Sequence, residues 1–366
     1  MSTVYIGTYT KPEAHVLGKG AGIYVYQMDP ATGALTFDSV ATEPINPSFL
    51  AVGPRRRFLY AVGEVMTFAG QPCGAVYAYA IDPETGRLTF LNGQPSLGGA
   101  PCHLSVERTG RFVLIANYMG GSVAVLPIQE DGRLGEIVDI VQHEGSSVNP
   151  ERQEAPHPHS IVLDPAHQYA FVPDLGIDKV MIYRFDGAQG TLTPGAVPSV
   201  SVQPGAGPRH FAFHPGGRFA YLINELDSTM TVFAYEPTRG ALTPVQTLDA
   251  LPEDYHGIRS AADVHVAPSG QFVYGSLRGP GSLVSLAIDA ETGRLTCLGH
   301  ESTQGLTPRN FALDPSGTFL LAANQDSDTV VVFRVDSRTG ALTPTGHVIE
   351  VPTPACVKVI SEVGIR

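Results

Sequence analysis

The chain of 366 residues contains an internal repeat, which constrains its fold more than any other feature of the sequence. A turn with an acidic loop, a glycine and a strand start resembling Leu-Thr recurs at seven glycines: Gly33, Gly86, Gly132, Gly190, Gly240, Gly293 and Gly340. Successive glycines lie 53, 46, 58, 50, 53 and 47 residues apart. A period of about 50 residues is typical of the blades of a β-propeller and exceeds that of the shorter helical repeats.

A second signature has the same period and the same number of copies. It consists of a proline or small residue, a short strand, a turn and a second strand that begins with an aromatic residue. Its copies begin at Pro47, Pro101, Pro158, Pro208, Ala262, Pro308 and Pro354. The turns, as at 214–219 and 314–319, place proline and glycine where tight β-turns need them.

The two ends of the chain complete the count of blades. The last signature, at Pro354, is followed by one strand, whereas strands expected at 4–9, 22–27 and 35–38 have no signature before them. A final strand that joins these three closes the ring and removes an exposed sheet edge. The sequence therefore predicts an all-β, seven-bladed propeller, with residues 1–366 in one domain. A single β-sandwich with appendages would not need two signatures in equal number.

Composition and charge narrow the range of partners. The chain is 43% hydrophobic, enough for a sizeable core, and its 40 glycines and 30 prolines disfavour long helices. The net charge is −12, and the longest basic run is Arg55-Arg56-Arg57. This balance offers no electrostatic footprint for nucleic acid or for an anionic membrane. An anionic substrate would need a local cluster of arginines.

The sequence also suggests a compartment and a redox state. No apolar stretch approaches the roughly 18 residues of a membrane span, and the N-terminus lacks the pattern of a signal peptide. We therefore expect a cytoplasmic protein. The four cysteines form no Cys-x-x-Cys pair, and we expect them to be reduced. The oligomeric state is left open, because a closed ring does not require a second subunit.

The repeats also indicate where a functional site would lie. The innermost strand of each propeller blade lines the central channel, so equivalent repeat positions converge at one mouth. The residues that follow the repeat proline are Ser48, Cys102, His159, Arg209, Asp263 (with a slip of one position), Arg309 and Ala355. The pairs that end the second strands are Gly63-Glu64, Asn117-Tyr118, Asp174-Leu175, Asn224-Glu225, Leu277-Arg278 and Asn324-Gln325. If both sets face one mouth, they form a polar ring.

The chemistry of this ring suggests hydrolysis. His159 and Glu225 are candidates to accept a proton from water, and Arg209, Arg278 and Arg309 are candidates to stabilise an oxyanion or a phosphate. The alternative is that polar residues at strand ends only cap strands and bind carbonyl groups between blades. An arginine directed into a channel favours the functional reading, because burying it is costly unless an anion meets it.

Other motifs carry less information. His157-Pro-His159 resembles a metal-binding pair, with Asp174 and Glu225 as further candidates, but no clear third ligand follows, and we predict no metal and no cofactor. A nucleophilic serine is disfavoured, because no Gly-x-Ser-x-Gly motif occurs. The polar segment 146–154 is either a mobile loop over the mouth or an ordinary solvated insertion.

At these residues the sequence resembles the lactonase family of seven-bladed propellers, which includes 6-phosphogluconolactonase of the cycloisomerase type and is related to carboxymuconate-lactonizing enzyme. The resemblance covers essentially the whole chain. It rests on Tyr5-Ile-Gly-Thr-Tyr9, on Gly205-Ala-Gly-Pro-Arg-His-Phe-Ala-Phe-His-Pro215, on Tyr221-Leu-Ile-Asn-Glu-Leu226, on elements between Gln246 and His265, and on Pro308-Arg309.

The resemblance implies hydrolysis of 6-phospho-D-glucono-1,5-lactone in the pentose phosphate pathway, without a required metal. It places the catalytic roles on His159, Arg209, Glu225 and Arg278. The family often has Asn or Asp where this chain has Leu277. Whether His159 or Glu225 is the base stays open. For the substrate, a small sugar lactone that the resemblance implies is phosphorylated, we expect binding by His103, Asn117, Tyr118, Asp174, His210, Arg259 and Arg309.

Two alternatives remain at this point. The first keeps the fold and changes the reaction to that of a muconate-type cycloisomerase or of a lactonase for an unphosphorylated sugar. The second is a propeller scaffold without enzymatic activity that presents loops to a protein partner. A scaffold predicts an exposed apolar patch and no anion site in the channel mouth.

Overall fold

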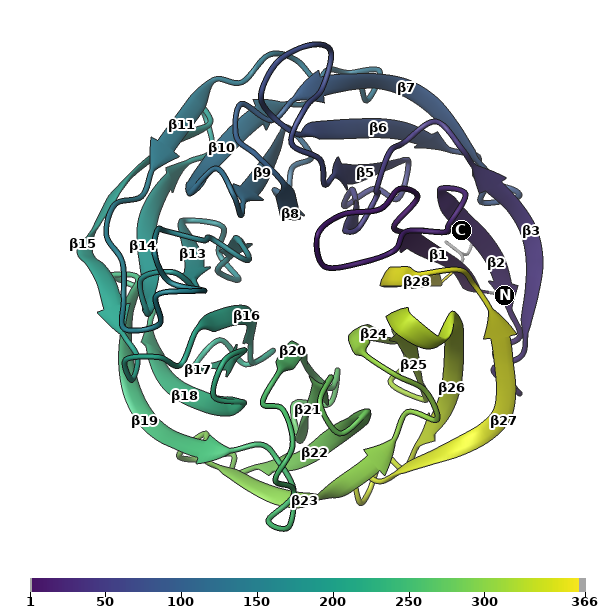
Figure 1. Ribbon diagram of the computed structural model, residues 1–366, viewed down its shortest axis with the longest axis vertical. Coiled ribbons are helices and arrows are strands. Elements are labelled where there is room, and N and C mark those ends of the chain that lie inside the picture. Colours follow the sequence, from purple (N-terminus) through teal and green to yellow (C-terminus); the bar gives the residue numbers. More distant parts are fainter. Residues whose placement is uncertain (1, 362–366) are drawn as a thin grey trace.

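The computed structural model describes residues 2–361, which form a ring of seven four-stranded antiparallel sheets around a central channel (Figure 1). The predicted all-β, seven-bladed propeller is confirmed. From the channel outward, the blade shared by the two ends has β28 (Pro354–Ser361), β1 (Ser2–Thr8), β2 (Ile23–Met28) and β3 (Leu35–Ala41).

The other six blades follow in chain order, each running from the channel to the rim. Their strands are β4 (Leu50–Val52), β5 (Phe58–Gly63), β6 (Ala75–Ile81) and β7 (Leu88–Pro95); β8 (Pro101–Val106), β9 (Phe112–Asn117), β10 (Ser122–Pro127) and β11 (Asp139–Gln142); β12 (Val162–Leu163), β13 (Tyr169–Asp174), β14 (Lys179–Asp186) and β15 (Thr191–Ser201); β16 (Pro208–Phe213), β17 (Phe219–Asn224), β18 (Thr229–Glu236) and β19 (Ala241–Asp249); β20 (Ala261–Val266), β21 (Phe272–Leu277), β22 (Ser282–Ile288) and β23 (Leu295–Ser302); and β24 (Pro308–Leu313), β25 (Phe319–Asn324), β26 (Thr329–Val335) and β27 (Leu342–Glu350).

The ring closes where the sequence predicts. Strand β28 pairs antiparallel with β1, with Val4 opposite Val359 and Ile6 opposite Val357, and Figure 1 shows these two strands side by side. The three N-terminal strands lie within three residues of their predicted bounds. Within residues 2–361, the one helical segment is a short 3-10 turn at Gln325–Ser327, and no helix is long and apolar enough to cross a membrane.

The two repeated signatures contact each other across the interfaces between blades. At six of the seven interfaces, the aromatic residue that opens a second strand packs against the turn glycine of the following blade, and at the seventh Thr3 meets Gly86. A Cβ atom added to Gly293 would lie 2.4 Å from Cδ1 of Phe219, and one added to Gly190 would lie 2.3 Å from Cε1 of Phe112. The Tyr221 hydroxyl also donates a hydrogen bond to the carbonyl oxygen of Gly293 (3.3 Å). Any side chain at the turn glycine would therefore push neighbouring blades apart.

The acidic residue of the turn has a local role. The Oδ1 atom of Asp289 accepts hydrogen bonds from the backbone N–H groups of Glu291 (3.1 Å) and Thr292 (2.8 Å). These two bonds add to the backbone bond from the Gly293 N–H to the Asp289 carbonyl oxygen (2.8 Å). Gly293 has a φ of 72°, which side-chain-bearing residues rarely adopt. Asp29, Asp82 and Asp336 make the same pair of bonds in their own turns.

Substituting this glycine tests the contact between blades. We expect Gly293→Ala to lower the free energy of unfolding by about 3 kcal/mol, from backbone strain at positive φ and from overpacking against Phe219. Gly217→Ala is the matched control, because Gly217 has a φ of 68° but open space around it. There we expect about 1 kcal/mol, from strain alone. Equal losses in urea denaturation of the two variants would contradict the packing argument.

Candidate active site

Most residues that follow the repeat proline do meet in the channel. Ser48, Cys102, His159, Arg209, Arg309 and Ala355 line one small cavity, together with Phe49, His210 and Asn310. In the blade of Arg209, the pairing register shifts between Pro208 and His210, so that Arg209 forms a bulge. A bulge re-aims the side chain of its extra residue. Equivalent shifts flank Cys102 and Arg309.

Asp263 is not part of this layer, contrary to the sequence prediction. The register of its blade shifts between Ala261 and Val264, so Ala262 takes the position equivalent to Arg209. The Ala262 carbonyl oxygen accepts a hydrogen bond from Nη1 of Arg209 (2.5 Å). The Asp263 carboxylate lies one layer further along the channel, on His210.

The pairs that end the second strands divide into two roles. Successive residues of a strand point to opposite faces, so only one member of each pair can face the mouth. Tyr118, Glu225 and Arg278 do so. Asn117 instead donates to the Ser96 carbonyl oxygen (3.2 Å), and the Asp174 carboxylate binds Nδ1 of His143 (2.6 Å). Asn117 and Asp174 are fully buried and hold loops in place, so the structure does not bring these two predicted substrate-binding residues into the mouth.

Glu225 is the centre of the mouth. Its Oε2 atom lies 2.8 Å from Nε of Arg209 and 3.0 Å from Nη2 of Arg278. Its Oε1 atom lies 2.7 Å from Nη2 of Arg152. The Nε2 atom of His159 is 4.0 Å from Oε2. The structure thus brings together all four residues predicted to be catalytic, and it adds a third arginine on the same carboxylate.

These charges fix the protonation states at neutral pH. Burial alone would raise the pKa of Glu225, but Arg278 and Arg209 together hold it well below its usual value, so this carboxylate is ionised. Burial, aided by the charge of Arg209, lowers the pKa of His159 well below 6.5. Burial also lowers the pKa of Arg209 to about 10, which leaves it protonated. A neutral imidazole therefore faces an ionised carboxylate and several guanidinium groups.

Arg152 lies on the segment 144–157, between β11 and β12, and it was missed because this segment is outside the repeats. The segment is held in place: Oδ1 of Asn149 accepts from the backbone N–H of Arg152 (3.2 Å), and the Gln153 amide donates to the Leu175 carbonyl oxygen (2.9 Å). The Arg152 side chain is 43% exposed and covers Glu225. The solvated insertion expected at 146–154 thus contributes a charge to the mouth.

A second carboxylate lies in the same mouth. Glu64 holds the same repeat position as Glu225 and accepts hydrogen bonds from the Tyr9 hydroxyl (2.8 Å) and from Ser48. Arg309 lies over the Tyr9 ring, 5.4 Å from its centroid. Within residues 2–361, the Arg309 guanidinium forms no ion pair with a carboxylate at salt-bridge distance. Glu64 belongs to a pair that ends a second strand, and Tyr9 ends the motif Tyr5-Ile-Gly-Thr-Tyr9. The sequence therefore marked both positions, although neither residue was predicted as a site residue.

The His157-Pro-His159 pair does not form a metal site. The His157 ring stacks on Tyr118, with centroids 4.5 Å apart, and its Nε2 atom lies 3.2 Å from Glu154. His159 points into the channel and meets the edge of Tyr118. Across residues 2–361, no group of three or more His, Cys, Asp and Glu side chains is arranged to bind a metal ion.

The remaining predicted substrate-binding residues lie in different places. Tyr118 and Arg309 belong to the mouth. Arg259 does not, because its guanidinium is exposed and pairs with the Asp249 carboxylate (2.6 Å), away from Glu225. The rings of His103 and His210 form the next layer of the channel, and the His210 centroid lies 5.4 Å from that of His159.

Comparison with known proteins identifies the family. The sequence profile described as "Lactonase, 7-bladed beta-propeller" matches residues 3–359. The chain belongs to this family. It is 39% identical over 359 residues to a Bacillus subtilis protein named 6-phosphogluconolactonase, with 98% of each chain covered. A Pectobacterium carotovorum protein of the same name is 37% identical over 80% of this chain and 81% of its own.

A solved structure supports the same assignment. The protein described as the Pseudomonas aeruginosa periplasmic gluconolactonase, PpgL, superposes with a TM-score of 0.91 at 36% identity, with 99% of each chain covered. This lactonase fold thus matches the architecture expected from the repeats, including the blade shared by the two ends.

The protonation state of His159 can be measured directly. In an NMR pH titration, we expect its imidazole to take up a proton well below pH 6.5. Because the Glu225 carboxylate favours the charged imidazolium, Glu225→Gln should lower this pKa further. Glu236→Gln, which changes an exposed carboxylate paired with Arg239, is the control and should leave the titration unchanged. A His159 midpoint at or above 6.5, or no response to Glu225→Gln, would contradict the electrostatic account.

Proposed function

We propose that this chain hydrolyses 6-phospho-D-glucono-1,5-lactone to 6-phosphogluconate, a step of the pentose phosphate pathway. The observation that carries the proposal is the convergence of a neutral imidazole, His159, with the guanidinium groups that surround Glu225. Ester hydrolysis needs a proton acceptor for water and positive charge for the oxyanion, and this cluster offers both. The names of the relatives at 39% and 37% identity support the same reaction.

His159 is the proposed base. It is neutral at pH 7, so one ring nitrogen has a free lone pair to accept a proton from water as the oxygen attacks the lactone carbonyl. The imidazolium that forms is stabilised by Glu225 and then donates the proton to the ring oxygen as the C–O bond breaks. Glu225 itself is a weak base, because its charge is already neutralised by arginines.

The arginines are proposed to stabilise the tetrahedral oxyanion. The Nε atom of Arg278 is buried and has no hydrogen-bond partner within residues 2–361. A buried donor without a partner is costly, and an oxygen of the substrate would satisfy it. Glu225 holds Arg209 and Arg278 on one carboxylate, so their orientation is set before the substrate binds.

The phosphate is proposed to bind at the outer part of the same cluster. In the buried part of the mouth, two carboxylates, Glu64 and Glu225, face a larger number of guanidinium groups, so this part is locally positive in a chain of net charge −12. The guanidinium groups are Arg152, Arg209, Arg278 and Arg309. Arg152 is the exposed member, and it can exchange Glu225 for an incoming phosphate. Arg309 lies close by without a carboxylate partner at salt-bridge distance among the described residues.

An unphosphorylated lactone is the second candidate substrate, because the P. aeruginosa structure is described as a gluconolactonase. That structure is also described as periplasmic, and the cytoplasmic location expected for this chain stays a prediction.

The proposed reaction can be measured as the rate at which the protein consumes freshly generated 6-phosphogluconolactone, corrected for spontaneous hydrolysis. We expect this rate to be fast and insensitive to chelator, and we expect unphosphorylated gluconolactone to be turned over more slowly. Turnover of neither lactone would contradict the proposed function.

Removing the proposed base should nearly abolish turnover. We expect His159→Ala to lower kcat by ~10²–10⁴-fold, the usual contribution of acid–base catalysis, and Glu225→Gln to cause a loss of similar size by releasing the arginines. His347→Ala, on the outer strand β27, is the matched control and should retain full activity. Near-normal rates in both site variants would contradict the assignment.

Arg152 is expected to decide the preference for a phosphorylated substrate. Arg152→Met should raise KM for the phosphorylated lactone about tenfold or more, with little change in kcat, because one charge-assisted contact is lost. KM for the unphosphorylated lactone should stay unchanged. Arg259→Met removes a paired surface arginine as the control and should change neither KM. An equal effect of Arg152→Met on both lactones would show that Arg152 does not contact the phosphate.

A further inference from the structure

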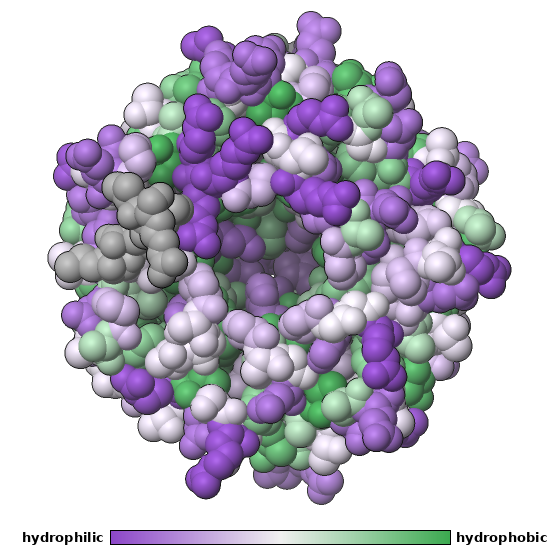
Figure 2. Space-filling view, turned by 180° about the vertical axis from the view of Figure 1, so that it is seen from behind, coloured by the Kyte–Doolittle hydropathy of each residue, from purple (hydrophilic) through white to green (hydrophobic). Residues whose placement is uncertain are grey.

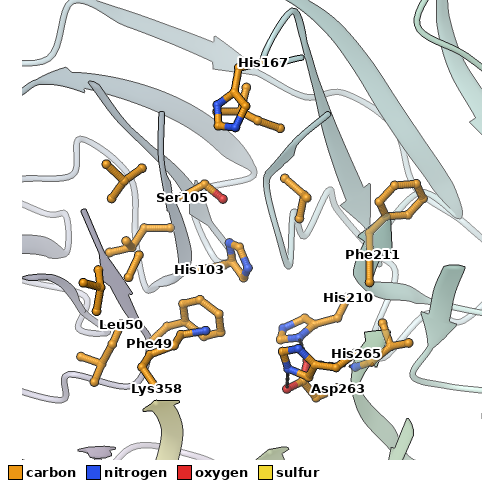
Figure 3. Close-up of a pocket in the computed structure, with 18 residues that line it drawn as sticks. Phe49, Leu50, His103, Ser105, His167, His210, Phe211, Asp263, His265 and Lys358 are labelled. Carbon is orange, nitrogen blue, oxygen red and sulfur yellow. Dashed lines mark hydrogen bonds and ion pairs between the residues drawn. The ribbon is translucent and has the colours of Figure 1, made fainter. Parts of the chain in front are cut away.

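A larger cavity lies at the other end of the channel, toward the carboxyl ends of the innermost strands. Figure 2 shows the ring from behind, with a hollow at its centre, and Figure 3 shows the residues that line the cavity. Val52, Val106 and Leu163 mark its outer level, near the ends of their strands. Phe49 and His210 belong to the walls of both this cavity and the small one beneath Glu225, so their rings lie between the two spaces.

Lys358 brings an ammonium group to this cavity. Its ammonium lies 4.4 Å from the centroid of the Phe49 ring, a cation–π contact that holds it against the cavity wall (Figure 3). No carboxylate pairs with it within residues 2–361. The ammonium donates no hydrogen bond to an oxygen or nitrogen atom of residues 2–361, so N–H donors that do not face the ring are available to a ligand.

His103 supplies a second donor. Its Nδ1 atom lies 3.3 Å from the backbone nitrogen of Ile161 and accepts that N–H, so the ring hydrogen is on Nε2. The ring packs on Phe49, with centroids 4.1 Å apart, which fixes its orientation. Burial, together with the nearby His210, lowers the pKa of His103 well below 6.5. It therefore acts as a neutral donor at physiological pH.

Among residues 2–361, one carboxylate lines the cavity, that of Asp263, and its oxygens already accept hydrogen bonds. Oδ1 of Asp263 lies 2.6 Å from Nδ1 of His210, and Oδ2 lies 2.9 Å from Nε2 of His265. The side-chain amide of Asn310 also donates to this carboxylate. Figure 3 shows the two imidazoles directed at Asp263, with Lys358 on the opposite wall. The oxygens of this carboxylate are therefore already used by neighbouring side chains, and the free donors of the cavity come from a lysine and a histidine.

We propose that this cavity is a second ligand site, distinct from the one beneath Glu225, and that it binds a small oxyanion, a carboxylate or a phosphate, between Lys358 and His103. An ammonium and a neutral imidazole N–H are typical donors to such groups. Asp263 holds His210 and His265 so that their remaining ring nitrogens can accept hydrogen bonds from hydroxyl groups of the same ligand.

The test follows the imidazole C–H resonances of His103 and His265 by NMR while inorganic phosphate, and separately acetate, is added to the full chain. We expect saturable shifts of both residues in the wild type. Lys358→Met should weaken the binding about tenfold or more, because a charged donor is lost, whereas Lys358→Arg should largely retain it. Turnover of the lactone substrate should be unchanged in both variants, which also shows that they fold.

The possible outcomes distinguish a phosphate site from a carboxylate site, and both from the absence of a site in this cavity. Shifts with phosphate alone identify a phosphate site, and shifts with acetate alone identify a carboxylate site. Shifts that persist undiminished in Lys358→Met would overturn the proposal, because the ligand would then lie elsewhere, as at the arginines of the mouth. If neither probe shifts His103 or His265 in the wild type, the proposal is also overturned. If the Lys358→Met variant does not fold, the presence or absence of saturable His103 and His265 shifts in the wild type decides whether the proposal holds.

Discussion

The contact between an aromatic ring and a turn glycine of the next blade is the interaction on which the rest of the structure depends. A four-stranded blade has two broad faces, and each must be covered by a neighbour before its apolar side chains are removed from water. The glycine turn lets the outer hairpin of one blade approach the ring that opens the second strand of the preceding blade, as Gly293 approaches Phe219. Repetition of this contact fixes the spacing between blades, and therefore the width of the channel.

A channel of fixed width makes a buried charge cluster possible. Residues at equivalent repeat positions meet at one level, so Arg209 from β16 and Glu225 after β17 are brought together with Arg278 after β21. Breaking a buried ion pair by removing one partner typically costs about 3–5 kcal/mol. Arg209, Arg278 and Glu225 are tolerated there because each pairs with an opposite charge. Burial, aided by the charge of Arg209, keeps His159 neutral beside the carboxylate, as a proton acceptor requires.

The sequence was sufficient for the ring and for the residues at repeat positions, because turn chemistry and period are local properties. It was insufficient where orientation depends on register. Asn117 and Asp174 stand next to residues of the mouth, yet alternation along the strand turns them inward to hold loops. In β20 the pairing register shifts between Ala261 and Val264, and this shift places Asp263 beside His210, one layer further along the channel than Arg209. Arg152 and Arg259 lie in connections outside the repeats, where only the path of the loop decides which arginine reaches Glu225.

The most direct test of the account is a crystal structure of the chain with bound 6-phosphogluconate. The account predicts that the carboxylate lies against Arg209 and Arg278 beside His159, with the phosphate at Arg152 and Arg309. The product would then occupy the mouth that Glu225 centres. Product bound only in the opposite cavity, between Lys358 and His103, would contradict the claim that the arginine cluster is the site of lactone hydrolysis.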